Sequence, residues 1–420
     1  MRNQTNTIGL GVIAAAVVVI VSAAGVLSLN NSRAMRAANL ERAEHPLVTR
    51  NETEIRNRDI AFYTRRTEED PAGASDRETL ARLLFSRSRY TGSTGDLARA
   101  ESLARKSVAL RTERNGQAFE LLASVLMTRH AFREAQSVAA RADSLNPDTP
   151  AHLALLGEIE LELGEYDSAS SHFRAIHYDG EQFTIGARLA RWYELTGRAD
   201  IARQLLARSI TRVLRRDDLP REQVAWFYFR MGELEMRAGR LSAADSAFHN
   251  GLAINPEDLR ILGGLARVQA ARGNWQSAID YGARATAIQL DPATVGTMST
   301  AYAALGDSVQ SASFANAMAI SALRQPGTIH RAWGLFLLDH GTQQDRAEVL
   351  RRARRDIRER HDVYGHDLLA WALFKTDHPA DARTEMSLAL AQHTEDILLA
   401  EHARAIGIAP AIASATGPGQ

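Results

Sequence analysis

Histidine and carboxylate side chains are the residues of this chain that could form a metal site or an acid–base pair. The chain contains thirteen histidines. Their closest groupings are His172 with His177, and His361-Asp362 with His366-Asp367. The two histidines of each pair are five positions apart, which places them about 140° apart around a helix. Neither pair forms the His-Glu-x-x-His arrangement of zinc hydrolases. We therefore expect hydrogen-bonded histidines and no metal site.

Other catalytic patterns are also missing from the sequence. The chain has no cysteine, which excludes disulfides and thiolate metal sites. The pairs Gly263-Gly264 and Gly9-x-Gly11 lack the strand–turn–helix context of a phosphate-binding loop. No spacing places a serine, a histidine and an aspartate together. We expect a protein that is not an enzyme and needs no cofactor and no small-molecule substrate.

The densest charge cluster is a run of arginines near residue 355. Acidic residues are interleaved with it, and no aromatic residue joins it. A solvated helix face is the simplest interpretation, and a contact with an acidic protein or with lipid headgroups is the alternative. Nucleic acid is disfavoured, because the whole chain has 50 basic and 50 acidic residues and therefore no net field. The run comprises Arg351, Arg352, Arg354, Arg355, Arg358 and Arg360.

A sequence motif that repeats with a period of 34 residues dominates the middle of the chain. A glycine is followed five positions later by an alanine and then by a large apolar or small residue. A fixed period in this range is typical of stacked, like supersecondary units. The small residues let two helices approach closely, and the glycine supplies a turn with positive φ. The pairs are Gly164 with Ala169, Gly239 with Ala244, Gly273 with Ala278 and, more weakly, Gly197 with Ala202.

This pattern resembles the tetratricopeptide repeat over residues 76–406. The 116–149 unit offers Leu122, Ala123, Ala135 and Pro147 at the positions where the family has leucine, a small residue, alanine and proline. The resemblance implies an all-α fold: a right-handed superhelix of about nine helical hairpins. The units are expected to begin near Ala81, Gly116, Pro150, Phe183, Ala225, Leu259, Pro292, Gly327 and Val363.

The resemblance also implies a concave groove, lined by the first helix of each unit. The groove positions of this sequence carry arginines and aromatic residues, which protein interfaces use as anchors. An alternative for each aromatic residue is that it covers an apolar edge between units. The expected partner-binding residues are Arg89, Arg191, Trp226, Phe229, Glu233, Arg267, Arg331, Tyr364, Asp367 and Trp371.

The function that these residues imply is non-catalytic protein binding. A peptide or helix would lie in the groove, as in an interaction scaffold for bacterial cell-envelope assembly. The alternative is a carbohydrate or cell-wall binding module, in which Trp226, Tyr364 and Trp371 would stack on sugar rings. Mixed charge beside the aromatic residues, such as Arg267 and Glu233, favours the protein partner.

The N-terminus carries a second signal, the run Ile8–Leu29, which contains no charged residue. It would span about 33 Å as a helix, enough to cross a bilayer core. Retention as a transmembrane anchor is favoured over cleavage as a signal segment near Ala24. Arg33 and Arg36 after the run argue for a cytoplasmic solenoid. The signal-like start argues for export, and we favour a membrane-anchored solenoid outside the cytoplasm.

The chain therefore divides into four expected parts. Residues 1–30 form the transmembrane anchor or signal segment, and 31–75 form a linker with one helix that begins at an Asn51 cap. Residues 76–406 form the solenoid. Residues 407–420, rich in alanine, glycine and proline, are expected to be a disordered tail.

Overall fold

The computed structural model describes residues 46–324 and 330–409, and this part of the chain contains helices and no strand. The predicted all-α class is confirmed. The predicted membrane segment Ile8–Leu29 lies outside the described residues, as do residues 31–45 of the linker and 410–420 of the tail. Within the described ranges, no helix is both long and apolar enough to cross a membrane.

The first described helix, α2 (Pro46–Glu69), is longer than the sequence predicts. It begins five residues before Asn51, so the predicted cap position lies inside the helix. It ends at Glu69, because the Asp70-Pro71 dipeptide stops helix propagation. Of the aromatic pair Phe62-Tyr63, Tyr63 packs against the core, whereas Phe62 stays 47% exposed.

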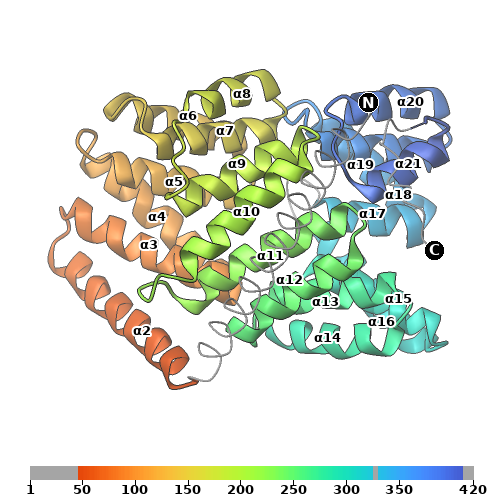
Figure 1. The fold of residues 1–420 in the computed structure, drawn as a ribbon, viewed down its shortest axis with the longest axis horizontal. Coiled ribbons are helices and arrows are strands. Elements are labelled where there is room, and N and C mark those ends of the chain that lie inside the picture. Colours follow the sequence, from red (N-terminus) through yellow and green to blue (C-terminus); the bar gives the residue numbers. More distant parts are fainter. Residues whose placement is uncertain (1–45, 325–329, 410–420) are drawn as a thin grey trace, which may run out of the picture.

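The helices after α2 pair in chain order into nine antiparallel hairpins, and the two helices of each hairpin pack on each other (Figure 1). A last single helix, α21 (Ile397–Ile406), packs against the ninth hairpin. The hairpins are α3 (Ala74–Thr91) with α4 (Thr94–Leu110), α5 (Gly116–Thr128) with α6 (Phe132–Leu145), α7 (Pro150–Leu163) with α8 (Tyr166–Ala175), α9 (Phe183–Leu195) with α10 (Ala199–Val213), α11 (Arg221–Arg237) with α12 (Leu241–Ile254), α13 (Leu259–Ala271) with α14 (Trp275–Ile288), α15 (Pro292–Ala304) with α16 (Ser308–Arg324), α17 (Arg331–His340) with α18 (Gln343–Asp356), and α19 (Val363–Phe374) with α20 (Pro379–Leu390).

Of the nine hairpins among the described residues, six start at the predicted residue, and the first, fifth and eighth start elsewhere. The first begins at Ala74 rather than near Ala81, because its buried stripe already includes Ala74 and Leu80. The fifth begins at Arg221 rather than near Ala225. The first described helix of the eighth begins at Arg331, after residues that the structure does not describe.

The repeat glycines and alanines have the predicted roles. Gly164, Gly239 and Gly273 have φ values of 81°, 73° and 76°, which side chains rarely adopt. The alanine five residues after each glycine is fully buried at the contact between the two helices. The turn glycine therefore reverses the chain, and the small residue lets the helices pack closely.

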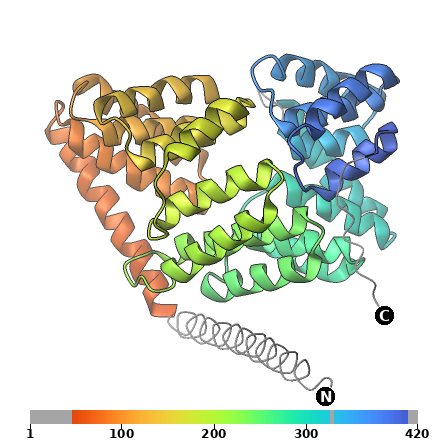
Figure 2. The same cartoon turned by 45° about the horizontal axis from the view of Figure 1, so that its top comes forward.

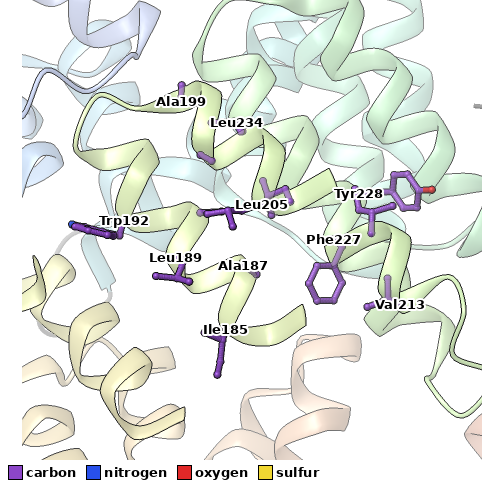
Figure 3. Packing of buried hydrophobic residues seen from close by; sticks show 14 of the residues in the cluster. Ile185, Ala187, Leu189, Trp192, Ala199, Leu205, Val213, Phe227, Tyr228 and Leu234 are labelled. Atoms are coloured by element: carbon purple, nitrogen blue, oxygen red, sulfur yellow. The ribbon is translucent and has the colours of Figure 1, made fainter. Parts of the chain in front are cut away.

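The largest part of the core runs through the middle of the array. Side chains of α9, α10 and α11 meet there, including Trp192, Leu205 and Phe227 (Figure 3). Phe173 stacks on Trp192 with ring centroids 5.4 Å apart, which joins the third hairpin to the fourth. Each hairpin thus buries its apolar face against its neighbours, as expected for a solenoid.

The array also curls until distant hairpins touch. In both ribbon views the C-terminal hairpins lie against the ends of α7 and α8 (Figures 1 and 2). The His361 N–H donates to the Leu163 carbonyl at 2.9 Å, and the Tyr166 hydroxyl accepts from the Val363 N–H at 2.8 Å. We call this contact between residues 357–363 and the α7–α8 turn the closure.

Two further observations show that the closure is tightly packed. The Thr394 hydroxyl donates to the Leu195 carbonyl at 2.5 Å in a buried position, which joins the ninth hairpin to the fourth. A Cβ atom placed on Gly164 would collide with the main chain of His361. Gly164 therefore forms a turn and also lies in close contact with the main chain of a distant segment, at His361. Gly273 forms a turn but has open space around it.

We predict that Gly164→Ala opens the closure and that Gly273→Ala does not. Both substitutions add the strain of a positive φ, about 1 kcal/mol. Only Gly164→Ala adds the collision with His361. Hydrogen–deuterium exchange at residues 357–363 should accelerate in Gly164→Ala alone. Equal exchange in the two variants would contradict the closure.

Candidate binding groove and charged interior

The first helices of six successive hairpins line an open groove of about 600 Å³. The groove is lined by side chains of α3, α5, α7, α9, α11 and α13, so it lies on the concave side of the array. Basic, acidic and aromatic side chains all contribute to it. We call it the open groove; among its lining residues are Arg89, Glu120, Glu158, Arg188, Trp226 and Arg260.

Among the described arginines that line this groove, Arg89 is the one without a carboxylate partner. It is exposed, and among the described residues it makes no hydrogen bond or ion pair; its guanidinium lies 5.8 Å from the Phe85 ring centroid. Its pKa lies below the ordinary arginine value, because the groove walls desolvate it and the positive charges of Arg260 and Arg188 oppose its own. Arginine stays charged at any physiological pH. The Glu158 charge favours the charged form of Arg89, but no carboxylate of the described residues pairs with it directly.

The two arginines beside Arg89 are already neutralised. Arg188 donates to a Glu158 carboxylate oxygen at 2.9 Å. Arg260 makes a two-point contact with Asp258, at 3.0 and 2.6 Å. These pairs hold the groove wall in place and leave Arg89 as the guanidinium available to a ligand.

Trp226 and Phe229 come from α11, on the far side of the groove from α3. The Trp226 ring is half-buried and meets Phe227 edge to face at 4.9 Å. Its indole N–H has no hydrogen-bond partner among the described residues, so a ligand could accept from it. Phe229 packs against the core, with Arg260 5.6 Å from its ring centroid.

The long N-terminal helix α2 reaches one end of the groove. Arg56 pairs with Glu222, a groove-lining residue of α11 more than 160 positions away in sequence. Glu52 lies near the same carboxylate, and its pKa is raised, first by burial and then by the Glu222 charge. The helix that the sequence assigns to a linker therefore forms part of the site's frame.

A second set of charges lies inside the curl of the array, and we call it the charged interior. Its centre is Glu194, a 3%-exposed carboxylate on α9. Arg237 donates to Glu194 at 2.6 Å, Arg191 at 3.2 Å and Arg230 at 3.3 Å. Burial would raise the pKa of Glu194, but the three arginines outweigh it and lower that pKa to about 2.

Neighbouring pairs extend this network along α11 and α13. Glu233 accepts from Arg267 and lies 3.4 Å from Arg237. Desolvation opposes its charge, but Arg267 and Arg237 lower its pKa below the ordinary value. The side chains of Glu233 and Arg267 are 12% and 26% exposed. Glu233 and Arg267 therefore use most of their hydrogen-bonding capacity in the ion pair with each other.

The ninth hairpin contributes the opposite wall of the charged interior. The Tyr364 ring lies between two guanidiniums, with Arg191 at 5.7 Å and Arg331 at 4.6 Å from its centroid. The Asp367 carboxylate is fully buried, accepts from Arg331, and lies 2.7 Å from the His402 Nδ1 atom. Tyr364 thus joins the fourth hairpin to the eighth and ninth.

Trp371 lies at the outer end of this wall. Its ring stacks on His402 with centroids 4.2 Å apart, and the Lys375 ammonium lies 5.0 Å from the ring centroid. Its indole N–H donates to Asp339 at 3.0 Å. Both the ring face towards His402 and the N–H are therefore engaged within the chain.

The structure divides the ten sequence-predicted site residues into three groups. Arg89 and Trp226 line the open groove, with Phe229 packed just behind it. Trp371 lies outside the groove. The remaining six, which one concave surface was expected to present together, meet one another in the charged interior: Arg191, Glu233, Arg267, Arg331, Tyr364 and Asp367.

Sequence reasoning missed the residues that organise both sites. Glu194 and Arg237 were not singled out, although Arg191 and Glu194 are three apart and Glu233 and Arg237 four apart on one helix face. Such spacings are a readable sign of helix-face pairs. No local pattern could have shown that Thr394 would reach Leu195, because 199 positions separate them.

Across residues 46–324 and 330–409, no group of three or more histidine or carboxylate side chains could hold a metal ion. The predicted histidine pairs make local contacts instead: His172 lies 2.7 Å from Glu160, and His366 lies 2.7 Å from Glu385.

No family model matches this chain, and no curated protein matches it. Solved structures with a similar arrangement include that of the APC/C hetero-tetramer Cut9–Hcn1, with a TM-score of 0.48 and 15% identity over 80% of this chain and 56% of that chain. PilF of Pseudomonas aeruginosa has a TM-score of 0.41 and 13% identity over 53% of this chain and 97% of its own. YrrB, described as a TPR protein with an unusual peptide-binding site, has a TM-score of 0.28 and 17% identity over 48% and 95%.

The described residues form an all-helical solenoid of repeated hairpins, each packed against the next.

We predict that Glu194 makes the solenoid sensitive to acid. In the folded protein the pKa of the Glu194 carboxylate is about 2, whereas its ordinary value is 4.5. Its stabilisation is therefore complete above pH 4.5 and is lost as the pH falls towards 2. Glu194→Gln should cost about 3–5 kcal/mol at pH 7, because three buried arginines lose their counter-charge. It should also flatten the fall in melting temperature between pH 5 and 2.

The matched control is Glu158→Gln, which removes a carboxylate paired with one arginine and 30% exposed. It should cost less than about 1 kcal/mol. Melting curves followed by circular dichroism at pH 7, 5 and 3 compare the two. A similar cost for both substitutions would show that the arginine cluster around Glu194 is energetically unimportant.

Proposed function

We propose that this protein is a non-enzymatic interaction scaffold that holds an extended, acidic segment of a partner protein in the open groove. The observation that carries the proposal is Arg89, a guanidinium in a concave groove of about 600 Å³ that has no carboxylate partner. A volume of this size lies in the range of ligand-binding pockets. Arginine forms two-point contacts with carboxylates, so a glutamate or aspartate of the partner fits it.

Trp226 supplies a second anchor on the opposite wall. Its half-buried ring offers apolar area, and its free N–H offers a donor to a peptide carbonyl. Aromatic residues and arginines are the usual centres of binding energy in protein interfaces. The charge balance of the groove, with several arginines and glutamates, suits a peptide of mixed sequence more than a uniform polyanion.

The residues of the charged interior have a different part in the proposal. Arg191, Arg267 and Arg331 are already paired with carboxylates of the chain. A partner would have to break those pairs at a cost of several kcal/mol. We therefore assign partner binding to Arg89 and Trp226, and the maintenance of the curl to the charged interior.

Carbohydrate binding is the weaker alternative. It needs free aromatic faces, but Tyr364 lies between two guanidiniums and Trp371 stacks on His402. Only Trp226 of the three candidate rings lines the groove. A single aromatic ring, Trp226, among charged groove residues favours a peptide over a carbohydrate as the ligand.

For the location of the protein, we propose the outer side of a bacterial inner membrane, as part of envelope assembly. This rests on the uncharged run Ile8–Leu29 alone.

We predict that peptides selected on the full-length chain from a random displayed library will be enriched in aspartate and glutamate. Arg89→Gln should weaken the binding of such a peptide by about tenfold, because a charged hydrogen bond contributes about 1.5 kcal/mol or more. Trp226→Ala should weaken peptide binding by a similar factor. Fluorescence anisotropy of the labelled peptide measures both.

Arg99→Gln is the matched control, since Arg99 is an exposed arginine on the second helix of the same hairpin and lies outside the groove. Its affinity for the peptide should stay within twofold of the unmodified protein. Peptides without acidic residues, or peptides that bind Arg89→Gln equally well, would refute the proposed site.

A reporter that is active only outside the cytoplasm, fused after Gln420, tests the location. We expect activity in the membrane fraction. Activity in the soluble fraction would mean that the N-terminal segment is cleaved, and an inactive reporter would place the solenoid in the cytoplasm.

A further inference from the structure

A second cleft, of about 820 Å³, lies on the other side of the array from the open groove. It is formed by α18, the second helix of the eighth hairpin, and by the turn that joins α19 to α20. We call it the basic cleft. Its charged lining consists of Arg346, Arg351, Arg354, Arg355, Arg358 and Lys375, with Asp377 as the opposing acid.

Some of these charges are compensated within the chain. Arg351 makes a two-point contact with Glu348 at 2.7 and 2.6 Å, and the Lys375 ammonium lies 3.0 Å from Asp339. The pKa of Glu348 is lowered to about 2, chiefly by the hydrogen bond from Arg351. The arginine run is therefore partly the solvated, salt-bridged helix face that its sequence suggests.

Arg354 and Arg358 are different. Both are exposed, line the cleft, and make no side-chain hydrogen bond or ion pair within the part of the chain that the structure describes. Arg354 lies in the last turn of α18, and Arg358 lies in the turn that follows the helix. Both guanidiniums, with free donors, thus line one cavity that is large enough for a ligand.

We propose that the basic cleft binds a carboxylate-rich segment of a protein partner. The basic residues of α18 run from Arg346 to Arg355, a length of about 14 Å along the helix, and Arg358 follows in the next turn. An extended acidic segment of about five residues covers this stretch, whereas a small phosphate compound would reach only two or three of the arginines. Guanidiniums form two-point hydrogen bonds with carboxylates.

Other polyanions fit the cleft less well. Its lining has no tryptophan, tyrosine or phenylalanine on which the bases of a nucleic acid could stack, and its one ring is the imidazole of His378. A membrane surface is flat, and the lining carries no exposed large apolar side chain that would insert into it. The chain itself offers no acidic tail, because residues 409–420 contain no aspartate or glutamate.

The test is the binding of a fluorescein-labelled octaglutamate peptide to the full-length chain, measured by anisotropy at low and at physiological salt. The double substitution Arg354→Glu with Arg358→Glu should weaken binding by tenfold or more. Physiological salt should weaken binding to the unmodified protein, because the contacts are exposed. The same double substitution made in the Arg89→Gln background should still weaken octaglutamate binding by tenfold or more, which separates this cleft from the open groove.

The matched control is Arg99→Glu with Arg208→Glu. It makes the same change in net charge at two exposed arginines outside the cleft, on α4 and α10. Equal weakening by both double variants would overturn the proposal in favour of a general charge effect. Tighter binding of tripolyphosphate than of octaglutamate, or of vesicles containing anionic lipid, with the same dependence on Arg354 and Arg358, would overturn it in favour of a phosphate ligand or a membrane. Unchanged melting curves exclude misfolding of the variants.

Discussion

The contact that organises this structure is the closure between residues 357–363 and the α7–α8 turn. A main-chain hydrogen bond from His361 to Leu163 and the bond from Val363 to the Tyr166 hydroxyl hold segments almost 200 positions apart. A solenoid otherwise buries surface only between successive hairpins. Because the closure brings the ninth hairpin onto the third and fourth, half of the concave surface becomes an interior, and only the part lined by α3 to α13 stays open to a partner.

The two halves of the concave surface use the same residue types for different purposes. In the charged interior the carboxylates are paired with guanidiniums of the chain, and Glu194 is shared by Arg191, Arg230 and Arg237. Buried ion clusters of this kind lose strong hydration when they form, so they add little net stability but strongly penalise any arrangement that breaks them. They therefore select one curl of the array. In the open groove Arg89 has no such partner, which is why we propose this groove as the binding site.

Glycine at the repeat turns shows how one position can meet two requirements. Every turn glycine with positive φ allows a hairpin, but Gly164 also lies against the main chain of His361, where no side chain would fit. The repeat pattern and the closure thus depend on the same residue. The basic cleft near Arg354 is lined by α18 and the α19–α20 turn, and so lies outside both concave sites.

The sequence by itself determined the all-helical class, the hairpin repeat and the residues that make it. Gly239 with Ala244, or Gly273 with Ala278, act within about ten residues of each other, and local sterics decide such contacts. It also pointed to Arg89 and Trp226 as groove residues. Only the tertiary structure decided that Tyr364 and Asp367 would be enclosed rather than presented. That outcome depends on the summed rotation between successive hairpins, to which every packing contact adds a little. No single residue pattern encodes this rotation, so the closure and the division of the groove follow from the folded array alone.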